Sequence, residues 1–171
     1  MQVYSVEAII QALSNADVQY LVVGGLAVNA HGYKRLTDYV DLVIGLEPSN
    51  IVNGLRALSS IGYQMSIPVT PEDFADAEKR EGWRRNKNMI VLKLWSDAHR
   101  RTPIDVFVYE PFDFQAAYKA ARWLPMGGRL HAPIVSLETL LAMKESAGRP
   151  QDLADISELK RVQELRGKKD Q

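Results

Sequence analysis

The sequence predicts an α/β (α+β) protein, in which a mixed β-sheet is flanked by helices and followed by a C-terminal helical part. Short apolar segments alternate with helix-compatible segments through the first 90 residues. Two further apolar segments, joined by a polar turn, predict an antiparallel hairpin. After Pro111 the pattern becomes mainly helical. This order of elements is typical of a mixed sheet. We therefore expect an α/β core over residues 1–112 and a helical region packed on it over residues 113–171.

The elements of the first part follow from the spacing of apolar residues. Recurrence at three and four residues predicts a helix, and a short apolar run bounded by glycine or proline predicts a strand. Ser49 is the expected N-cap of the third helix. In chain order the predictions are a helix over 4–15, a strand over 20–23, a helix over 26–31, a strand over 40–44, a helix over 50–60 and a strand over 63–67.

The elements of the second part begin with a helix start signal at Thr70-Pro71. Gly127-Gly128 predicts a turn, and Ser136 predicts a second helix N-cap. Residues 167–171 are expected to fray. The predicted elements are a helical segment over 70–87, strands over 89–95 and 104–109, and helices over 113–122, 136–147 and 152–165.

Composition limits the classes of function. Lys plus Arg and Asp plus Glu both total 21, so the formal net charge is zero and no overall field attracts nucleic acid. The chain has no cysteine, which excludes disulfides and thiol chemistry. Neither a secretion signal nor an apolar stretch of about 20 residues is present. We expect a cytoplasmic protein with no membrane partner.

Three features point to chemistry on phosphates. Gly24-Gly25 ends the first predicted strand, where backbone amides can approach an anion. Asp41 lies in the second predicted strand, and Asp105 lies in a later one. Aspartate is a poor strand former, so an aspartate inside an apolar strand suggests a functional role. Carboxylates from neighbouring strands beside such a turn suit metal-assisted phosphoryl transfer. Taken singly, the glycines are also compatible with a plain turn, and each aspartate with an exposed strand edge.

The order of these residues resembles a known pattern. Gly24-Gly25, followed by Arg35-Leu-Thr37-Asp38-Tyr39-Val40-Asp41, is similar to the Gly-Gly and Arg-x-Thr-x-Asp-x-Asp motifs of the nucleotidyltransferase superfamily. The likeness is greatest to small bacterial AbiEii/MNT-like proteins of the abortive-infection and toxin–antitoxin type. Residues 137–155 resemble the helical C-terminal motif of that group, so the resemblance covers about 20–159.

The resemblance implies roles for particular residues. Asp41 and Asp105 are implied to bind Mg²⁺, or Mn²⁺, and Asp105 to help deprotonate the acceptor hydroxyl. For Lys144 the alternative is a solvated helix face. The residues implied to bind the nucleoside triphosphate are Gly24, Gly25, Arg35, Thr37 and Lys144.

Tyr39 departs from the pattern, because the family carries its first metal-binding aspartate at this position. Tyr39 and Asp41 share a face of the strand, whereas Asp38 points to the other face. A phenol, with pKa about 10, is a poor Mg²⁺ ligand. Three explanations compete. Asp38 replaces the ligand with the help of a bulge, the protein is a catalytically silent relative, or the chain is an altered form of an active one.

The resemblance implies a metal-dependent transferase that moves a nucleoside monophosphate from a triphosphate to a hydroxyl of tRNA, protein or a small molecule. Alternatives are a nucleotide- or partner-binding module on the same fold and a plain interaction protein. A basic patch beside Trp83 and Trp95 would favour a nucleic-acid acceptor, but a solvated charged face is the preferred interpretation. The basic residues concerned are Lys79, Arg80, Arg84, Arg85, Lys87, His99, Arg100 and Arg101.

Overall fold

A mixed sheet organises the chain in the computed structural model, which describes residues 1–168. Its strands are β1 (Tyr20–Val23), β2 (Val40–Ile44), β3 (Gln64–Met65), β4 (Val91–Trp95), β5 (Ile104–Phe107), β6 (Arg122–Gly127) and β7 (Leu130–Ile134). The seven strands lie in the order β3-β4-β5-β2-β1-β7-β6. The pairs β2–β5 and β1–β7 are parallel, and the others are antiparallel.

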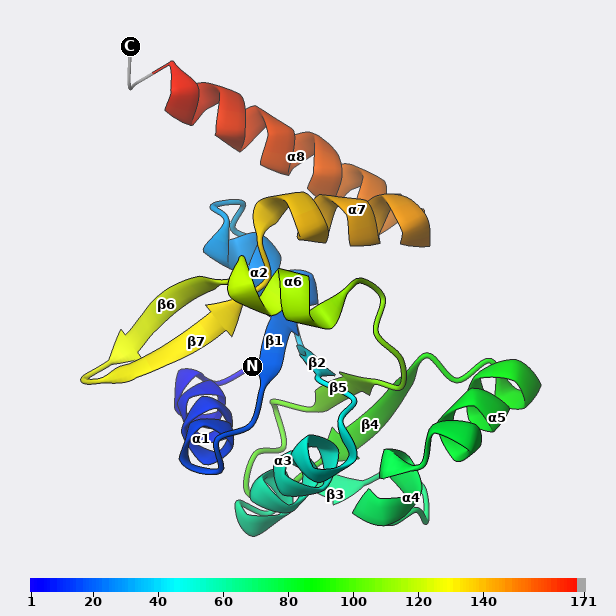
Figure 1. Ribbon diagram of the computed structural model, residues 1–171. Coiled ribbons are helices and arrows are strands. Elements are labelled where there is room, and N and C mark those ends of the chain that lie inside the picture. The colour runs from blue at the N-terminus through cyan, green and yellow to red at the C-terminus, as the bar shows by residue number, and fades with distance from the viewer. Residues whose placement is uncertain (169–171) are drawn as a thin grey trace.

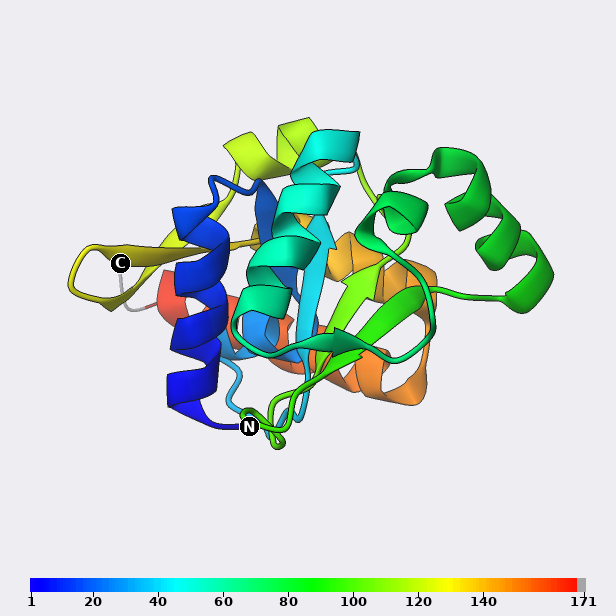
Figure 2. The same ribbon diagram turned by 90° about the horizontal axis from the view of Figure 1, so that it is seen from below.

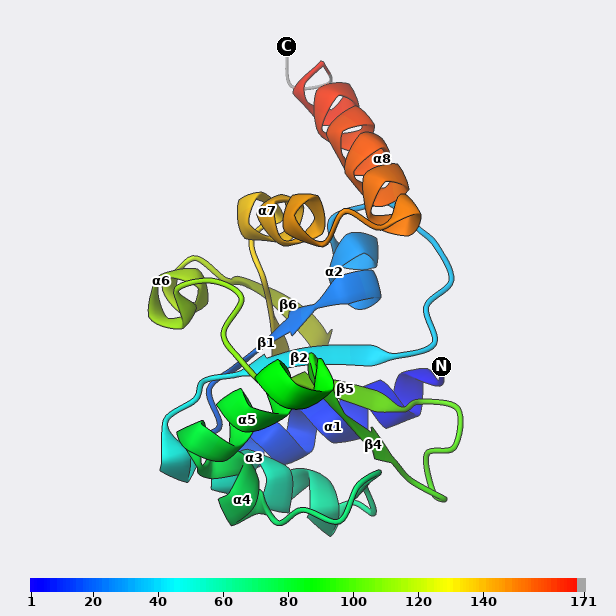
Figure 3. The ribbon, with the colours of Figure 1, turned by 90° about the vertical axis from the view of Figure 1, so that its right-hand side faces the viewer.

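Helices cover both faces of this sheet (Figure 1). They are α1 (Val3–Asn15), α2 (Gly24–Ala30), α3 (Pro48–Ser60), α4 (Pro71–Ala75), α5 (Ala77–Lys87), α6 (Phe114–Lys119), α7 (Leu137–Ala147) and α8 (Pro150–Gly167). Helices α1 and α3 lie side by side on one face, as Figure 2 shows. Helices α2, α7 and α8 lie on the other side (Figure 3). The predicted fold class is confirmed.

The main core lies between the sheet and the layer of α1 and α3. Ile44 of β2 lies against Gly54 of α3. Because side chains alternate along a strand, Leu42 shares this face, and so does its partner Val106 on β5. Both are fully buried. The opposite face of β2 and β5 is therefore free to carry polar groups.

Several predicted elements are present with altered ends. The strand predicted over 63–67 is reduced to the two residues of β3. The segment 70–87 forms two helices, because the backbone is extended at Asp76, whose side chain accepts hydrogen bonds from the amides of Glu78 and Lys79. The prediction that Ser49 caps α3 is wrong. Glu47 is the N-cap, and Pro48 is the first helical residue.

The sequence did not predict the hairpin of β6 and β7. The predicted helix over 113–122 ends at Lys119, and β6 begins at Arg122. Gly128 and Arg129 form the turn, and Gly127 and Gly128 both have positive φ. Strand β7 then joins the central sheet, where Val22 pairs with Ile134. Helices follow in α7 and α8, and Ser136 caps α7 as predicted.

The last helix reaches Gly167, and the predicted fraying otherwise concerns residues 169–171, which lie outside the described part of the chain. Among residues 1–168, no helix combines the length and the apolar composition needed to cross a bilayer.

Candidate active site

Four residues form a row across the sheet. Val23 of β1 pairs with Asp41 of β2, Asp41 pairs with Asp105 of β5, and Asp105 pairs with Lys93 of β4. Directly paired residues point to the same face of a sheet, so Asp41 and Asp105 are neighbours on the face opposite Leu42. The structure thus brings together the two carboxylates that the sequence singled out.

The glycine pair lies at one end of this row. Gly24 follows β1 with a φ of +61°, and a Cβ atom built on it would overlap the Asp41 carboxylate. The backbone of Gly25 lowers the pKa of the Asp41 carboxyl, which places this backbone close to the carboxylate. A Cβ atom on Gly25 would overlap Thr37. Both glycines are therefore required because side chains from the segment before β2, and from β2 itself, pack directly on the turn.

A buried ionic cluster connects α7 and α8. The Lys144 ammonium lies 3.0 Å from Asp152 Oδ1 and 2.6 Å from Asp155 Oδ2. All three side chains are almost completely buried. The alternative interpretation of Lys144, a solvated helix face, is therefore wrong. Its ammonium is held by two carboxylates in the structure.

Two arginines extend the cluster toward the carboxylate row. Arg35 Nε lies 2.9 Å from Asp155 Oδ1, and its Nη2 donates to Oδ2 at 3.1 Å. Arg149 Nε donates to Asp152 Oδ2 at 2.6 Å, while its side chain remains 76% exposed. Together with Lys144 the cluster carries three cations and two anions. Two cations of the cluster, Lys144 and Arg149, act on Asp41 and lower the pKa of that carboxyl.

The environment shifts the carboxyl groups in opposite directions. Burial, and then the negative charge of Asp105, raise the pKa of Asp41 to about 6, despite the opposing effects of Gly25, Lys144 and Arg149. Burial also raises the pKa of Asp105, although Lys93 opposes this shift. Burial would raise the pKa of Asp155 too, but hydrogen bonds from Lys144, Gln151 and Arg35 outweigh it and hold that pKa below its usual value. The structure therefore destabilises the charged forms of Asp41 and Asp105, whereas it stabilises the charged form of Asp155.

Tyr39 lies beside the row and next to Lys93. Its side chain is exposed, and the Lys93 ammonium lies 5.0 Å from the centroid of its ring. The same ammonium lies 3.7 Å from Asp105 Oδ2. Strand β2 pairs with β5 without a register shift over Val40, Asp41 and Leu42, and Asp38 lies exposed before the strand begins.

The residues of the row fit one divalent cation better than two. Asp105 Oδ1 is buried and has no hydrogen-bond partner among the described residues. A buried, unpaired carboxylate oxygen is costly, and a cation beside Asp41 and Asp105 would satisfy it. Within residues 1–168 no group of three or more His, Cys, Asp or Glu side chains is placed to hold a metal ion. At the position where the resemblance implies a third carboxylate, the chain has Tyr39.

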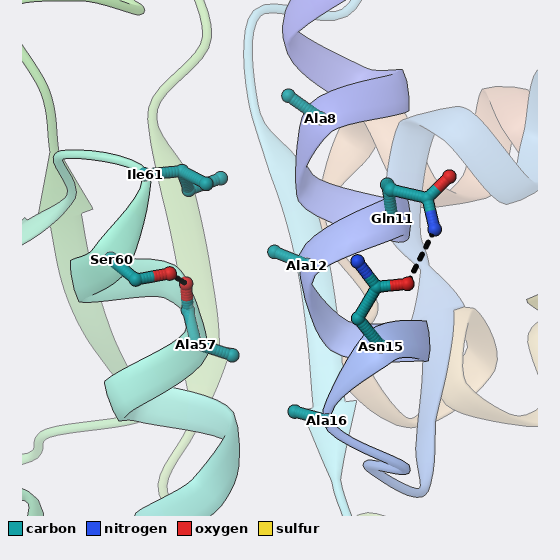
Figure 4. A pocket seen from close by; sticks show the side chains of 8 residues that line it. All are labelled: Ala8, Gln11, Ala12, Asn15, Ala16, Ala57, Ser60 and Ile61. Carbon is teal, nitrogen blue, oxygen red and sulfur yellow. Dashed lines mark hydrogen bonds between the residues drawn. The ribbon is translucent and has the colours of Figure 1, made fainter.

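Other candidates lie away from the row. The buried His31 shares a 2.8 Å hydrogen bond with the carbonyl of Val135, and burial lowers its pKa, so it is a core histidine. A hollow of about 430 Å³ lies between α1 and α3, on the opposite side of the sheet. Its lining, shown in Figure 4, contains alanines, amides, Ser60 and Ile61 but no ionisable group. It therefore lacks the chemistry of an active site.

The basic patch, which was the less favoured interpretation of these residues, does not form as one surface. Arg80 is buried and donates to the Phe74 carbonyl, and His99 is buried and stacked on Tyr63. Lys79, Arg85 and Arg100 pair with acidic neighbours, and Arg84 lies over the Tyr109 ring. Helix α5 precedes β4 and the turn 96–101 follows it, so the two groups lie at opposite ends of this strand.

Sequence reasoning missed two residues of the site, Lys93 and Arg149. The signal for Lys93 was a lysine between two buried leucines in a strand, which places it on the face opposite the core. The signal for Arg149 was its position between Gly148 and Pro150, directly before the carboxylates of α8. Neither position is informative until the strand pairing and the helix packing are known.

The mixed sheet, the glycine turn and the paired carboxylates define a nucleotidyltransferase-type fold. Among solved structures, the chain is similar to the lincosamide antibiotic adenylyltransferase LnuA bound to lincomycin, with a TM-score of 0.54 and 16% sequence identity. The match covers 90% of this chain and 93% of the adenylyltransferase chain. This likeness shows the fold. No protein-family model matches the sequence, and no curated protein matches it.

Substitution of Lys144 by methionine is expected to lower the free energy of unfolding by about 3 kcal/mol, because two buried carboxylates lose a shared cation. The matched control is Lys160→Met, which removes a half-exposed lysine 3.7 Å from Glu145. The control is expected to cost less than about 1 kcal/mol. Urea unfolding measures both values, and equal small losses would contradict the structural role of Lys144.

Ionisation of Asp41 is expected to oppose folding. The folded protein holds this proton with a pKa of about 6, above the ordinary value of 3.8, so stability falls as pH rises through this interval. Asp41→Asn removes the effect. Relative to the wild type, the variant should gain on the order of 2–3 kcal/mol between about pH 4 and pH 7. Thermal or urea unfolding in EDTA tests this, and parallel pH profiles of the two proteins would refute it.

Proposed function

We propose that the protein is a nucleotidyltransferase that moves a nucleoside monophosphate from a nucleoside triphosphate to a hydroxyl of a small molecule. The observation that carries the proposal is the direct pairing of Asp41 with Asp105, beside a glycine turn onto which the Asp41 carboxylate packs. ATP is the first donor to test, because the similar solved structure is described as an adenylyltransferase.

Each residue of the site has a separate role in the proposed reaction. Asp105 accepts the proton of the acceptor hydroxyl, whose oxygen then attacks the α-phosphorus while pyrophosphate leaves. Its raised pKa makes it a better base than an ordinary aspartate. The exposed guanidinium of Arg149 binds the phosphates, since Arg presents several donors to phosphate oxygens. Arg35 and Thr37 hold the segment before β2 against the glycine turn.

A divalent cation belongs to this proposal. Asp41 and Asp105 would hold one Mg²⁺ or Mn²⁺ ion, which supplies charge neutralisation for the phosphates when bound. The remaining work of binding and orientation falls to residues of the chain.

A small-molecule acceptor is favoured over tRNA and protein for two reasons. Most of the basic residues that would bind an RNA backbone are buried or paired with acidic side chains or an aromatic ring. The similar structure holds lincomycin, a small molecule. Transfer of the label to tRNA or to a protein would contradict the small-molecule acceptor. It would favour a toxin-type role instead.

A second candidate function is nucleotide binding without turnover. Tyr39 favours this candidate, because its side chain adds no negative charge beside Asp41. In addition, the Lys93 ammonium lies over the Tyr39 ring. Calorimetry that shows ATP binding, together with no transfer to any acceptor, would support this candidate.

Asp105→Asn is expected to reduce transfer of the label from ATP labelled at its α-phosphate by at least about a hundredfold, because the site loses its base. The assay contains Mg²⁺ and hydroxylated acceptors, lincomycin among them, with tRNA and cell protein in parallel. Asp38→Asn is the matched control, an exposed aspartate directly before β2 that should leave transfer unchanged. Transfer that survives in the Asp105 variant would defeat the assignment, and its loss in the control would make Asp38 the replacement ligand.

Arg149→Met is expected to weaken ATP binding about tenfold, because one charge-assisted contact to phosphate is lost. Arg161→Met is the control, since this arginine also lies on the surface of the C-terminal helical part, where it pairs with Glu158. Calorimetric titration with a non-hydrolysable ATP analogue measures both. An equal affinity in the two variants would remove Arg149 from the nucleotide site.

A further inference from the structure

We propose that Lys93 supplies a fixed positive charge at Asp105 in place of a second metal ion, so that the protein binds a nucleoside triphosphate with one divalent cation. This inference rests on the proposed function and concerns the same site. In a two-metal site, both cations are bound metal ions. In this protein, a lysine of a strand would take the place of one of them.

The first support is the position of Lys93 in the row. Lys93 and Asp105 are direct partners on antiparallel strands, so their side chains leave the sheet side by side. The ammonium lies 3.7 Å from Asp105 Oδ2. Asp105 Oδ1 is buried and unpaired among the described residues. One oxygen of this carboxylate therefore faces a built-in cation, and the other is left for a single ion shared with Asp41.

The second support is the way in which Lys93 is held. Its ammonium lies 5.0 Å from the centre of the Tyr39 ring, where the electron-rich face of an aromatic ring attracts a cation. A lysine side chain is flexible, and two partners, one directly before β2 and one on β5, restrict it. Tyr39 thus stands where the family pattern has a carboxylate, and in this chain its ring contacts a cation from the chain itself.

The third support is the local charge. Two divalent ions bring four positive charges, and the row offers two carboxylates, one of which already faces Lys93. A second divalent ion next to the ammonium would be repelled twice as strongly as a monovalent one at the same distance. One divalent ion and Lys93 together bring three positive charges, which suits two carboxylates and the phosphates of a nucleotide.

Counting bound metal tests this inference without measuring activity. Mn²⁺ is titrated into the protein saturated with a non-hydrolysable ATP analogue, and paramagnetic resonance measures free Mn²⁺. The wild type is expected to bind one Mn²⁺ per nucleotide complex. The double variant Tyr39→Asp with Lys93→Met restores a carboxylate and removes the cation, so it is expected to bind two.

The single variant Lys93→Met provides a second readout. In EDTA, the wild type is expected to retain measurable affinity for the analogue, and Lys93→Met to lose at least about tenfold of it, since among residues 1–168 Lys93 is the cation paired with Asp105. Lys87→Met, which changes an exposed lysine at the end of α5, is the control and should leave the affinity unchanged. Lys93→Gln repeats the test if the methionine variant is unstable in a thermal melt.

The outcomes separate this inference from the proposed function. Two Mn²⁺ ions in the wild-type complex, or an unchanged metal count in the double variant, overturn the role of Lys93 while leaving nucleotidyl transfer intact. An unchanged affinity of both Lys93 variants in EDTA also overturns it. A wild type that binds no nucleotide with or without metal removes both proposals.

Discussion

The parallel pairing of β2 with β5 is the constraint on which the candidate site depends. It sets Asp41 directly against Asp105 and leaves Leu42 and Val106 in the core. Because side chains alternate, a slip of one residue would turn a carboxylate into the core and a leucine or valine into the site. The burial of Leu42 and Val106 therefore fixes the register, and with it the distance between two negative charges.

The ionic cluster of α7 and α8 stabilises the other side of the site. Burying an isolated charge is costly, yet each carboxylate of the cluster has at least two partners from different segments. Arg35 belongs to the segment before β2, and Lys144 to α7. The ion pair of Arg35 with Asp155 thus connects α8 to the segment that packs on the glycine turn. This arrangement explains why residues far apart in sequence, Gly25, Lys144 and Arg149, affect one carboxylate at position 41.

The sequence predicted the parts of the fold that depend on local pattern. Strand β2 begins and ends where the apolar run Val40–Ile44 does, and the two aspartates meet as expected. The hairpin of β6 and β7 was missed because Pro125 and Pro133 interrupt the strand pattern, while its stability comes from pairing with the distant β1. The burial of Lys144 was missed for a similar reason. A lysine with polar neighbours resembles a surface residue until two aspartates of another helix approach it.

The two edge strands of the sheet, β3 and β6, offer fewer regular backbone hydrogen-bonding groups than the central strands, and this affects self-association in concentrated solution. Strand β6 contains Pro125, which has no amide hydrogen to offer, and its pairing with β7 is irregular between Pro125 and Gly127. At the other margin, β3 has only two residues. An extended peptide that reaches either margin finds few backbone groups in line. Self-association by strand addition, a common route to aggregation, is thereby discouraged at both ends of the sheet.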